Sequence, residues 1–233
     1  MSLSFFPLDH TGDGGDSTVR AGILMMCGEA SPEMLDCLHR YEITPGVFVR
    51  HPDQHPWCNP NNWTRDQMLP YTAGLFAIGE YQPIRRFFYQ RMKSFFFMQN
   101  FERDHVGTTK YPWPHFYKDE WGHTRFRFFD YADPLLPHHI WHLIIAGRIW
   151  WFYWFAPIGY LFLLIDLVVH SISPWTWEEN QMIALCYVQG RPWLLLYRLI
   201  CKGWRSRNTA YWTARHQPEY AVMLERLVGG EEP

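Results

Sequence analysis

Residues 149–172 read IWWFYWFAPIGYLFLLIDLVVHSI and form the most apolar part of the chain. No formally charged side chain occurs from Ile149 to Ile165, and apolar residues continue beyond Asp166. A helix needs about 17–25 predominantly apolar residues to cross a bilayer. This stretch therefore predicts an apolar helical element that contacts a membrane.

Two residues inside this stretch allow more than one helical arrangement. Pro157 and Gly159 interrupt the apolar run, so it could be one kinked helix or two helices that form a shallow hairpin in one leaflet. A hairpin buried in the protein core is the remaining alternative, because the mean hydropathy of the whole chain is only -0.27. The length of the run favours membrane contact over burial.

Basic and aromatic side chains follow the apolar run. Trp193 and Trp204 lie close in sequence to Lys202 and Arg205. This combination suits the anionic headgroup region of a membrane. The same cations also suit the C-terminal end of a helix in water, so both interpretations stay open.

Length, charge and cysteine usage narrow the class of protein. The chain has 233 residues, enough for one large domain, and a formal net charge of only -2, so nucleic acid is not an expected partner. Five cysteines without CxxC spacing favour a reducing compartment, and the first residues lack the pattern of a secretory signal. We expect association with the cytoplasmic side of a membrane, with lipid headgroups as partners and a homo-oligomer as a further option.

Helix-start signals and turn-rich stretches predict a mainly α fold, a single helical domain with long ordered loops and an apolar helical hairpin. A Thr64–Gln67 pair has the spacing of a capping box at the start of one helix. The expected helices cover residues 17–27, 32–41, 64–79, 83–100, 177–188 and 192–202.

Two long loops are expected between these helices, over residues 44–62 and 101–133. The second should contain a β-hairpin around Trp121 and Gly122. The single domain would then consist of a polar part, residues 12–133, and an apolar, membrane-associated helical part, residues 134–228.

Polar residues of the first third of the chain could converge on one site, because each group lies beside a turn or a helix start. Carboxylates and a histidine could supply general acid and base catalysis, while arginines and a glutamine could anchor an anionic or polyol substrate. The candidate catalytic residues are Asp16, His51 and Asp66, and the candidate substrate-binding residues are Arg20, Arg50, Arg65 and Gln67. Arg–Asp pairing that only holds the fold together is the alternative.

Three short motifs carry a family resemblance over about residues 12–76. They are DGGDSTVRAG at residues 13–22, PGVFVRHP at 45–52 and NNWTRDQMLPYTAGL at 61–75. Their order resembles a pattern in uncharacterised bacterial and phage proteins, and TRDQ with its following helix resembles elements of carbohydrate-active α/α-toroid enzymes. The resemblance implies a partial toroid in which Asp16, Arg20, Arg65 and Asp66 line a glycan-binding cleft.

A histidine cluster after Pro137 is the candidate metal site. A helix would place His138 and His142 on one face at i, i+4 spacing, where two imidazoles could bind zinc if Asp130 or Asp133 supplied a third ligand. Histidines at a helix cap or membrane boundary are the alternative. No Walker loop, GxGxxG turn or GxSxG elbow occurs, so no cofactor is expected.

Two functions from different classes follow. The first is a membrane-associated helical protein with a polar cleft that acts on a glycan or a lipid-linked polar substrate. The second is a non-catalytic membrane-associated or viral assembly protein, in which the polar pairs only fix the fold. A soluble metalloprotein that uses the histidine cluster is a third hypothesis.

Overall fold

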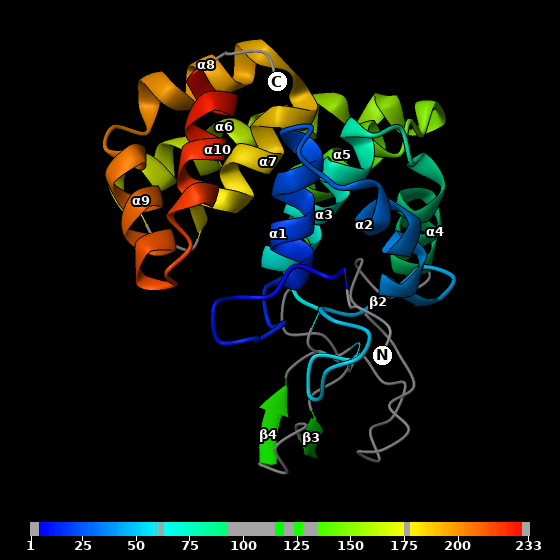
Figure 1. The fold of residues 1–233 in the computed structure, drawn as a ribbon. Coiled ribbons are helices and arrows are strands. Elements are labelled where there is room, and N and C mark those ends of the chain that lie inside the picture. The colour runs from blue at the N-terminus through cyan, green and yellow to red at the C-terminus, as the bar shows by residue number, and fades with distance from the viewer. Residues whose placement is uncertain are drawn as a thin grey trace.

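The computed structural model describes residues 5–58, 60, 63–92, 115–118, 124–127, 135–174 and 178–229. As predicted, the fold is mainly α-helical (Figure 1). The helices are α1 Ser17–Met26, α2 Pro32–Cys37, η1 Leu38–Tyr41, α3 Arg65–Ala77, α4 Tyr81–Met92, α5 Pro137–Ala146, η4 Trp150–Phe155, α6 Ala156–Ile172, α7 Glu179–Gln189, α8 Arg191–Ile200, α9 Trp204–Ala214 and α10 Pro218–Gly229. The strands are β1 Glu42–Thr44, β2 Val47–Phe48, β3 His115–Lys118 and β4 Thr124–Arg127.

Three helices form the centre of the domain, since α1, α3 and α7 are buried nearly all the way round. A helix without an exposed polar face belongs in a core. α1 crosses α3 at two glycines: a Cβ atom on Gly74 would stand 2.8 Å from the Cα atom of Gly22. The missing side chains therefore let the two backbones approach closely.

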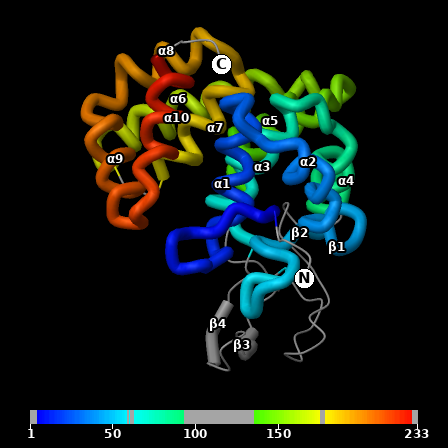
Figure 2. Tube along the Cα trace, viewed as in Figure 1, coloured from blue at the N-terminus to red at the C-terminus, as the bar shows by residue number. Residues whose placement is uncertain are grey.

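The first and last helices of the described chain pack against each other at this core. Figure 2 shows the C-terminal helix α10 beside the N-terminal helix α1. The Arg20 side chain of α1 donates from Nε to Oε1 of Gln217, just before α10, at 2.7 Å. Residues of the expected polar part and of the expected apolar part thus share one hydrophobic core.

Local signals placed several helix starts correctly. The Ser31 side chain accepts a hydrogen bond from the Met34 amide and caps α2, which continues directly into η1. Strands β3 and β4 pair antiparallel with Lys118 opposite Thr124, which confirms the expected hairpin. Trp121 and Gly122, and residues 93–100 of the expected helix 83–100, lie outside the described residues.

The capping box expected at Thr64 is not formed. Thr64 precedes α3, but its side chain caps no backbone amide and donates to Asp66 instead. Gln67 is fully buried and bonds to Thr18 and Asp16 of the α1 region. Gln67 therefore forms hydrogen bonds with a distant part of the chain in place of the local capping-box bonds that the spacing predicted.

The apolar stretch forms one continuous helical run, because the 3₁₀-helix η4 leads directly into α6. Pro157 lies in the first turn of α6, where its missing N–H leaves no hydrogen bond unmade. The turn considered between Ala156 and Gly159 is therefore absent, and an apolar hairpin forms instead between α5 and α6. At their contact, a Cβ atom on Gly159 would stand 2.3 Å from the Trp141 side chain.

Candidate functional site

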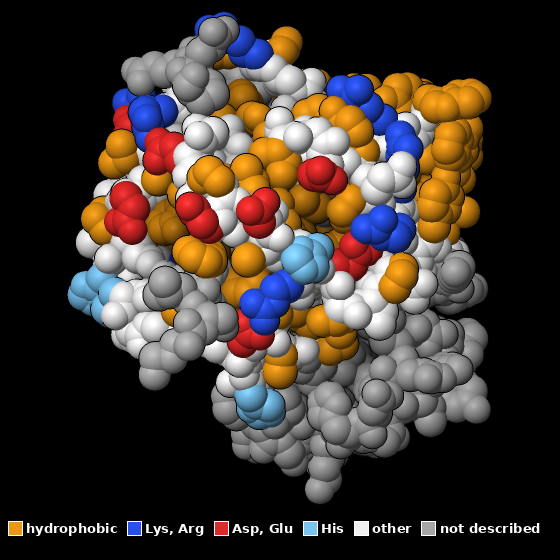
Figure 3. All heavy atoms as spheres, turned by 45° about the vertical axis from the view of Figure 1, so that its right-hand side comes forward, with side chains coloured by type: hydrophobic (Ala, Val, Ile, Leu, Met, Phe, Trp, Pro, Cys, Tyr) orange, Lys and Arg blue, Asp and Glu red, His pale blue; other side chains and the backbone are white. Residues whose placement is uncertain are grey.

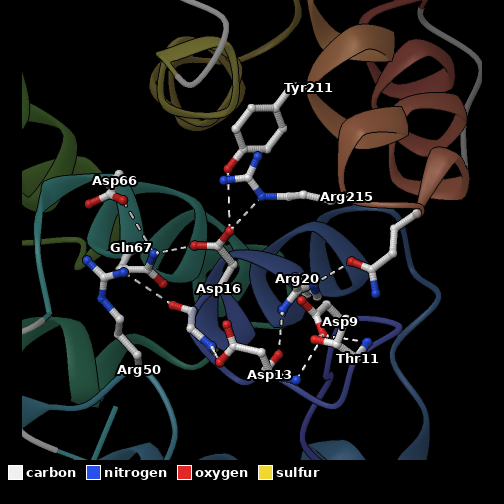
Figure 4. A network of polar contacts seen from close by, with 12 residues as sticks. Asp9, Thr11, Asp13, Asp16, Arg20, Arg50, Asp66, Gln67, Tyr211 and Arg215 are labelled. Carbon is white, nitrogen blue, oxygen red and sulfur yellow. Dashed lines mark hydrogen bonds and ion pairs between the residues drawn. The ribbon is translucent and has the colours of Figure 1, made fainter. Parts of the chain in front are cut away.

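Asp16 is the centre of a polar network at the N-terminal ends of α1 and α3 (Figure 4). Its Oδ1 atom accepts a hydrogen bond from Gln67 Nε2 at 3.0 Å. Its Oδ2 atom pairs with Arg215 Nε at 3.1 Å and accepts from the Tyr211 hydroxyl at 3.5 Å. Both carboxylate oxygens therefore have partners, and the network joins α1, α3 and α9.

Asp66 belongs to the same network. It accepts hydrogen bonds from the Thr64 hydroxyl and, at 3.4 Å, from Gln67 Nε2. Arg50 approaches from the loop after β2 and donates to Thr64 Oγ1 at 3.0 Å and to the Gly15 carbonyl at 3.3 Å. Four of the seven predicted site residues (Asp16, Arg50, Asp66 and Gln67) are thus brought together.

The other three predicted residues point elsewhere. Arg20 is buried and bonds to Gln217 and, at 3.5 Å, to the Asp13 carbonyl oxygen, and Figure 4 draws no contact between it and Asp16. His51 is also buried, its Nδ1 accepts from the Asp53 amide at 3.1 Å, and burial lowers its pKa. Arg65 lines a separate small pocket beside α5 and α6.

This small pocket has a volume of about 50 Å³, and its lining includes His138 and His139 of the histidine cluster. Ligand atoms of His138, His139 and Asp166 all lie within 4.8 Å of one another. His138 Nε2 and Asp166 Oδ2 are 3.1 Å apart. His139 replaces the expected His142 in this group, because the His142 ring extends to the Thr72 hydroxyl, 2.9 Å from Nε2. Asp130 and Asp133 lie outside the described residues.

A buried carboxylate that the sequence did not single out connects four helices. Glu179 of α7 accepts hydrogen bonds from Tyr197 of α8 and Arg207 of α9. His170 of α6 lies 3.1 Å from the same carboxylate through Nε2 and 3.5 Å from Glu178 through Nδ1. The Glu179 side chain is only 1% exposed, so this network fixes the relative positions of α6 to α9.

The opposite side of α6 is apolar and uncovered. Only Gly159, Leu163, Leu167 and His170 of this helix are buried, in one stripe. Trp150–Ile172 is long and apolar enough to cross a membrane, yet just 17% of its apolar stretch is buried. We define the apolar face by its exposed residues: Trp150, Trp151, Trp154, Ile158, Leu161, Phe162, Leu164, Ile165, Val168, Val169 and Ile172.

Helix α8 extends the apolar face and adds charge to it. Its Trp193 stacks on Tyr160 of α6 with ring centroids 5.2 Å apart. Leu195 and Leu199 of α8 are exposed. The neighbouring exposed residues on the same face are basic: Arg191, Arg198 and Lys202. Figure 3 shows apolar side chains gathered at the upper right edge of the molecule, next to basic ones.

A larger pocket is lined by residues outside these groups. It has a volume of about 440 Å³ and lies between α2, α3 and α4, with Leu38, Phe48 and Leu75 among its lining residues. The ion pair between Glu42 and Arg86, 2.5 Å apart, is also at this pocket. Besides these apolar residues and the ion pair, its lining includes His39, Tyr71 and Glu80.

Comparison of the chain with protein-family models, with curated proteins and with solved structures finds no match. The functional inference therefore rests on the apolar face, the Asp16 network and the histidine pocket.

Proposed function

We propose that this protein is a peripheral membrane protein that lies on an anionic bilayer and is held there by the apolar face. The observation that carries the proposal is the exposure of α6, whose outward residues are all apolar from Ile158 to Ile165. Soluble proteins rarely leave so large a contiguous apolar surface uncovered.

The composition of the rim favours a bilayer as the occupant. Trp150 and Trp154 are 72% and 69% exposed at the start of the apolar run, where amphipathic rings suit the membrane interface. Arg148 precedes them, and Arg198 and Lys202 flank the exposed leucines of α8. Such cations match the anionic cytoplasmic leaflet, which makes it the proposed side.

The buried stripe of α6 supports an in-plane orientation. Asp166 and His170 point from this helix toward α5 and α7, where they meet His138 and Glu179. A lone membrane-spanning helix would separate these polar groups from their partners in the hydrocarbon layer, at high cost. A helix that lies in the interface keeps them and still buries its apolar side.

Vesicle flotation of the full-length chain tests this proposal. Wild-type protein should float with vesicles of phosphatidylcholine and phosphatidylserine, and a Leu161→Glu/Ile165→Glu variant should bind at least tenfold more weakly. Ile43→Glu is the matched control, because Ile43 is a similarly exposed apolar residue on β1. A wild-type protein that stays in solution, alone or as a dimer through the same face, would overturn the proposal.

A second candidate function concerns the Asp16 network, as a site for a glycan or a lipid-linked polar substrate. Partial exposure of Arg50 and Asp66 within this network favours it. The saturated hydrogen bonds of Asp16 favour a structural role instead.

Turnover of a polyprenyl-linked disaccharide in vesicles, followed by mass spectrometry, separates the two roles. Under the substrate hypothesis Asp66→Asn with Arg65→Gln abolishes turnover and keeps the wild-type melting temperature. Unfolding of this variant, or a wild-type protein without turnover, would favour the structural role.

A further inference from the structure

We propose that His138, His139 and Asp166 bind a divalent transition-metal ion, and that zinc is the ion this ligand set fits. Two imidazoles and one carboxylate are the protein ligands of many catalytic zinc sites, which leave a further position for water or substrate. The site is independent of membrane binding, since it lies on the inner side of the α5–α6 hairpin.

The pocket has room for an ion and unsatisfied groups to bind it. Its volume of about 50 Å³ exceeds the roughly 10–15 Å³ that a single water needs. His138 is only 2% exposed; its Nδ1 has no hydrogen-bond partner among the described residues, and its Nε2 lies 3.1 Å from Asp166 Oδ2. A buried polar atom without a partner is unfavourable, so binding of an ion there would stabilise the protein.

The spacing of the donors is close to what zinc requires. Two ligands at about 2.0–2.2 Å from a tetrahedral zinc ion are roughly 3.4 Å apart. His138 Nε2 and Asp166 Oδ2 are 3.1 Å apart, and the His139 ligand atom lies within 4.8 Å of both. A small inward rotation of the His139 ring would complete the set.

The hydrogen bond of His139 leaves Nε2 as its ligand atom. Its Nδ1 accepts from the Leu136 amide at 3.2 Å. Binding of a metal at Nε2 would place the ring proton on Nδ1, so this hydrogen bond would be given up on loading.

Two further charges border the pocket and offset each other. Arg65 of α3 and Glu178, next to α7, line it together with the ligands. Glu178 also lies 3.5 Å from His170, so it is a neighbour of the metal site and not one of its proposed ligands. The ion would then be held by α5 and α6 and bordered by α3 and α7.

The experiment uses full-length protein that has been stripped with a chelator and dialysed. Calorimetric titration with Zn²⁺ should give one tight site, and Co²⁺ should give visible absorption bands of a low-symmetry complex. Asp166→Asn, which keeps the side-chain volume, should weaken Zn²⁺ binding at least tenfold, and His138→Ala should remove it. The exposed residue His39 supplies the matched control His39→Ala, which should bind like wild type.

One competing site needs its own control. His10 and His216 lie at the surface with ring centroids 4.4 Å apart and could bind zinc adventitiously. Binding that survives His10→Ala/His216→Ala and is lost in Asp166→Asn supports the proposal. The proposal is overturned if the His10→Ala/His216→Ala variant no longer binds Zn²⁺. It is also overturned if wild-type protein takes up no Zn²⁺ and gives no Co²⁺ absorption, a result that does not depend on whether His138→Ala folds.

Discussion

Gly22 of α1 lies directly on the backbone of Pro70 in α3: a Cβ atom at position 22 would stand 2.2 Å from the Pro70 carbonyl oxygen. Backbone atoms on both sides of this contact cannot move aside as a flexible side chain can. The packing of the central helices therefore depends on the absence of a side chain at this position.

Gly22→Val should consequently destabilise the protein by about 1–3 kcal/mol or more, as overpacking of a well-packed core does. Thermal unfolding followed by circular dichroism should show a melting temperature several degrees below that of wild type. Gly229→Ala is the control, because nothing lies within 4 Å of a Cβ atom at that position. Equal melting temperatures for the two variants would contradict the close approach of α1 and α3.

The Glu179 carboxylate should be a major contributor to stability. Glu179→Gln removes the charge that faces Arg207 and His170 in a buried site, and breaking such a pair costs about 3–5 kcal/mol. Urea unfolding should show this loss as a lower midpoint. Glu178→Gln should cost much less, since the Glu178 side chain is 29% exposed; similar losses in both variants would be inconsistent with a special role for Glu179.

The stability of the protein should fall as the pH rises through about 9. Burial alone would lower the pKa of His170, but Glu178 and Glu179 outweigh this effect and raise it to about 9. The protonated His170 ring therefore stabilises the folded protein. This contribution is complete below the pKa of the unfolded state, about 6.5, and is lost as the pH rises above the pKa of the folded state. The other facing groups keep their charge states, because Arg207 stays cationic and the Tyr197 pKa is raised well above 10.

Melting temperatures between pH 6 and pH 10 check this dependence. Wild type should lose stability over the alkaline half of this range, and His170→Gln should show a flatter profile with a lower melting temperature at pH 6. An unchanged profile in His170→Gln would assign the alkaline loss to other groups.

Binding to anionic vesicles should depend on salt and on the cations of α8. Each basic residue near an anionic surface contributes about 1 kcal/mol, so Arg198→Gln/Lys202→Gln should weaken binding by roughly 30-fold at low salt. Flotation in 0.5 M NaCl should reduce this difference, because the Debye length falls below about 5 Å. Arg40→Gln removes an exposed cation that pairs with Asp53 on another part of the surface, and should bind like wild type; equal weakening by this control would point to net charge alone.

The parts of the fold with local signals could be predicted from the sequence. A serine cap and a proline at the first helical position identified α2, and Pro137 begins α5 as expected. Helices α9 and α10 were not expected as separate elements, because Trp204 and Arg205 were assigned to a basic and aromatic cluster that follows the apolar run. Burial of Trp212 in the core, which only the complete fold supplies, determines their placement.

In the candidate sites, too, only the residues with a local sequence signal could be predicted. Asp16, Asp66 and Gln67 were expected together because they flank helix starts, whereas Tyr211 and Arg215 come from α9 and have no local signal. Asp166 was noted only as an interruption of the apolar stretch. A lone carboxylate in such a helix commonly has a buried partner, and this signal could have directed attention to the α5 histidines.

The contact between Gly159 and Trp141 has a consequence for how the protein would reach a membrane. Because this contact and the Glu179 network hold α6 in place within the folded domain, the apolar face is complete before any lipid is met. Docking on a bilayer would then involve no coil-to-helix transition and little loss of conformational entropy. Far-ultraviolet circular dichroism of the protein should accordingly be the same with and without vesicles, unlike that of amphipathic peptides that fold as they adsorb.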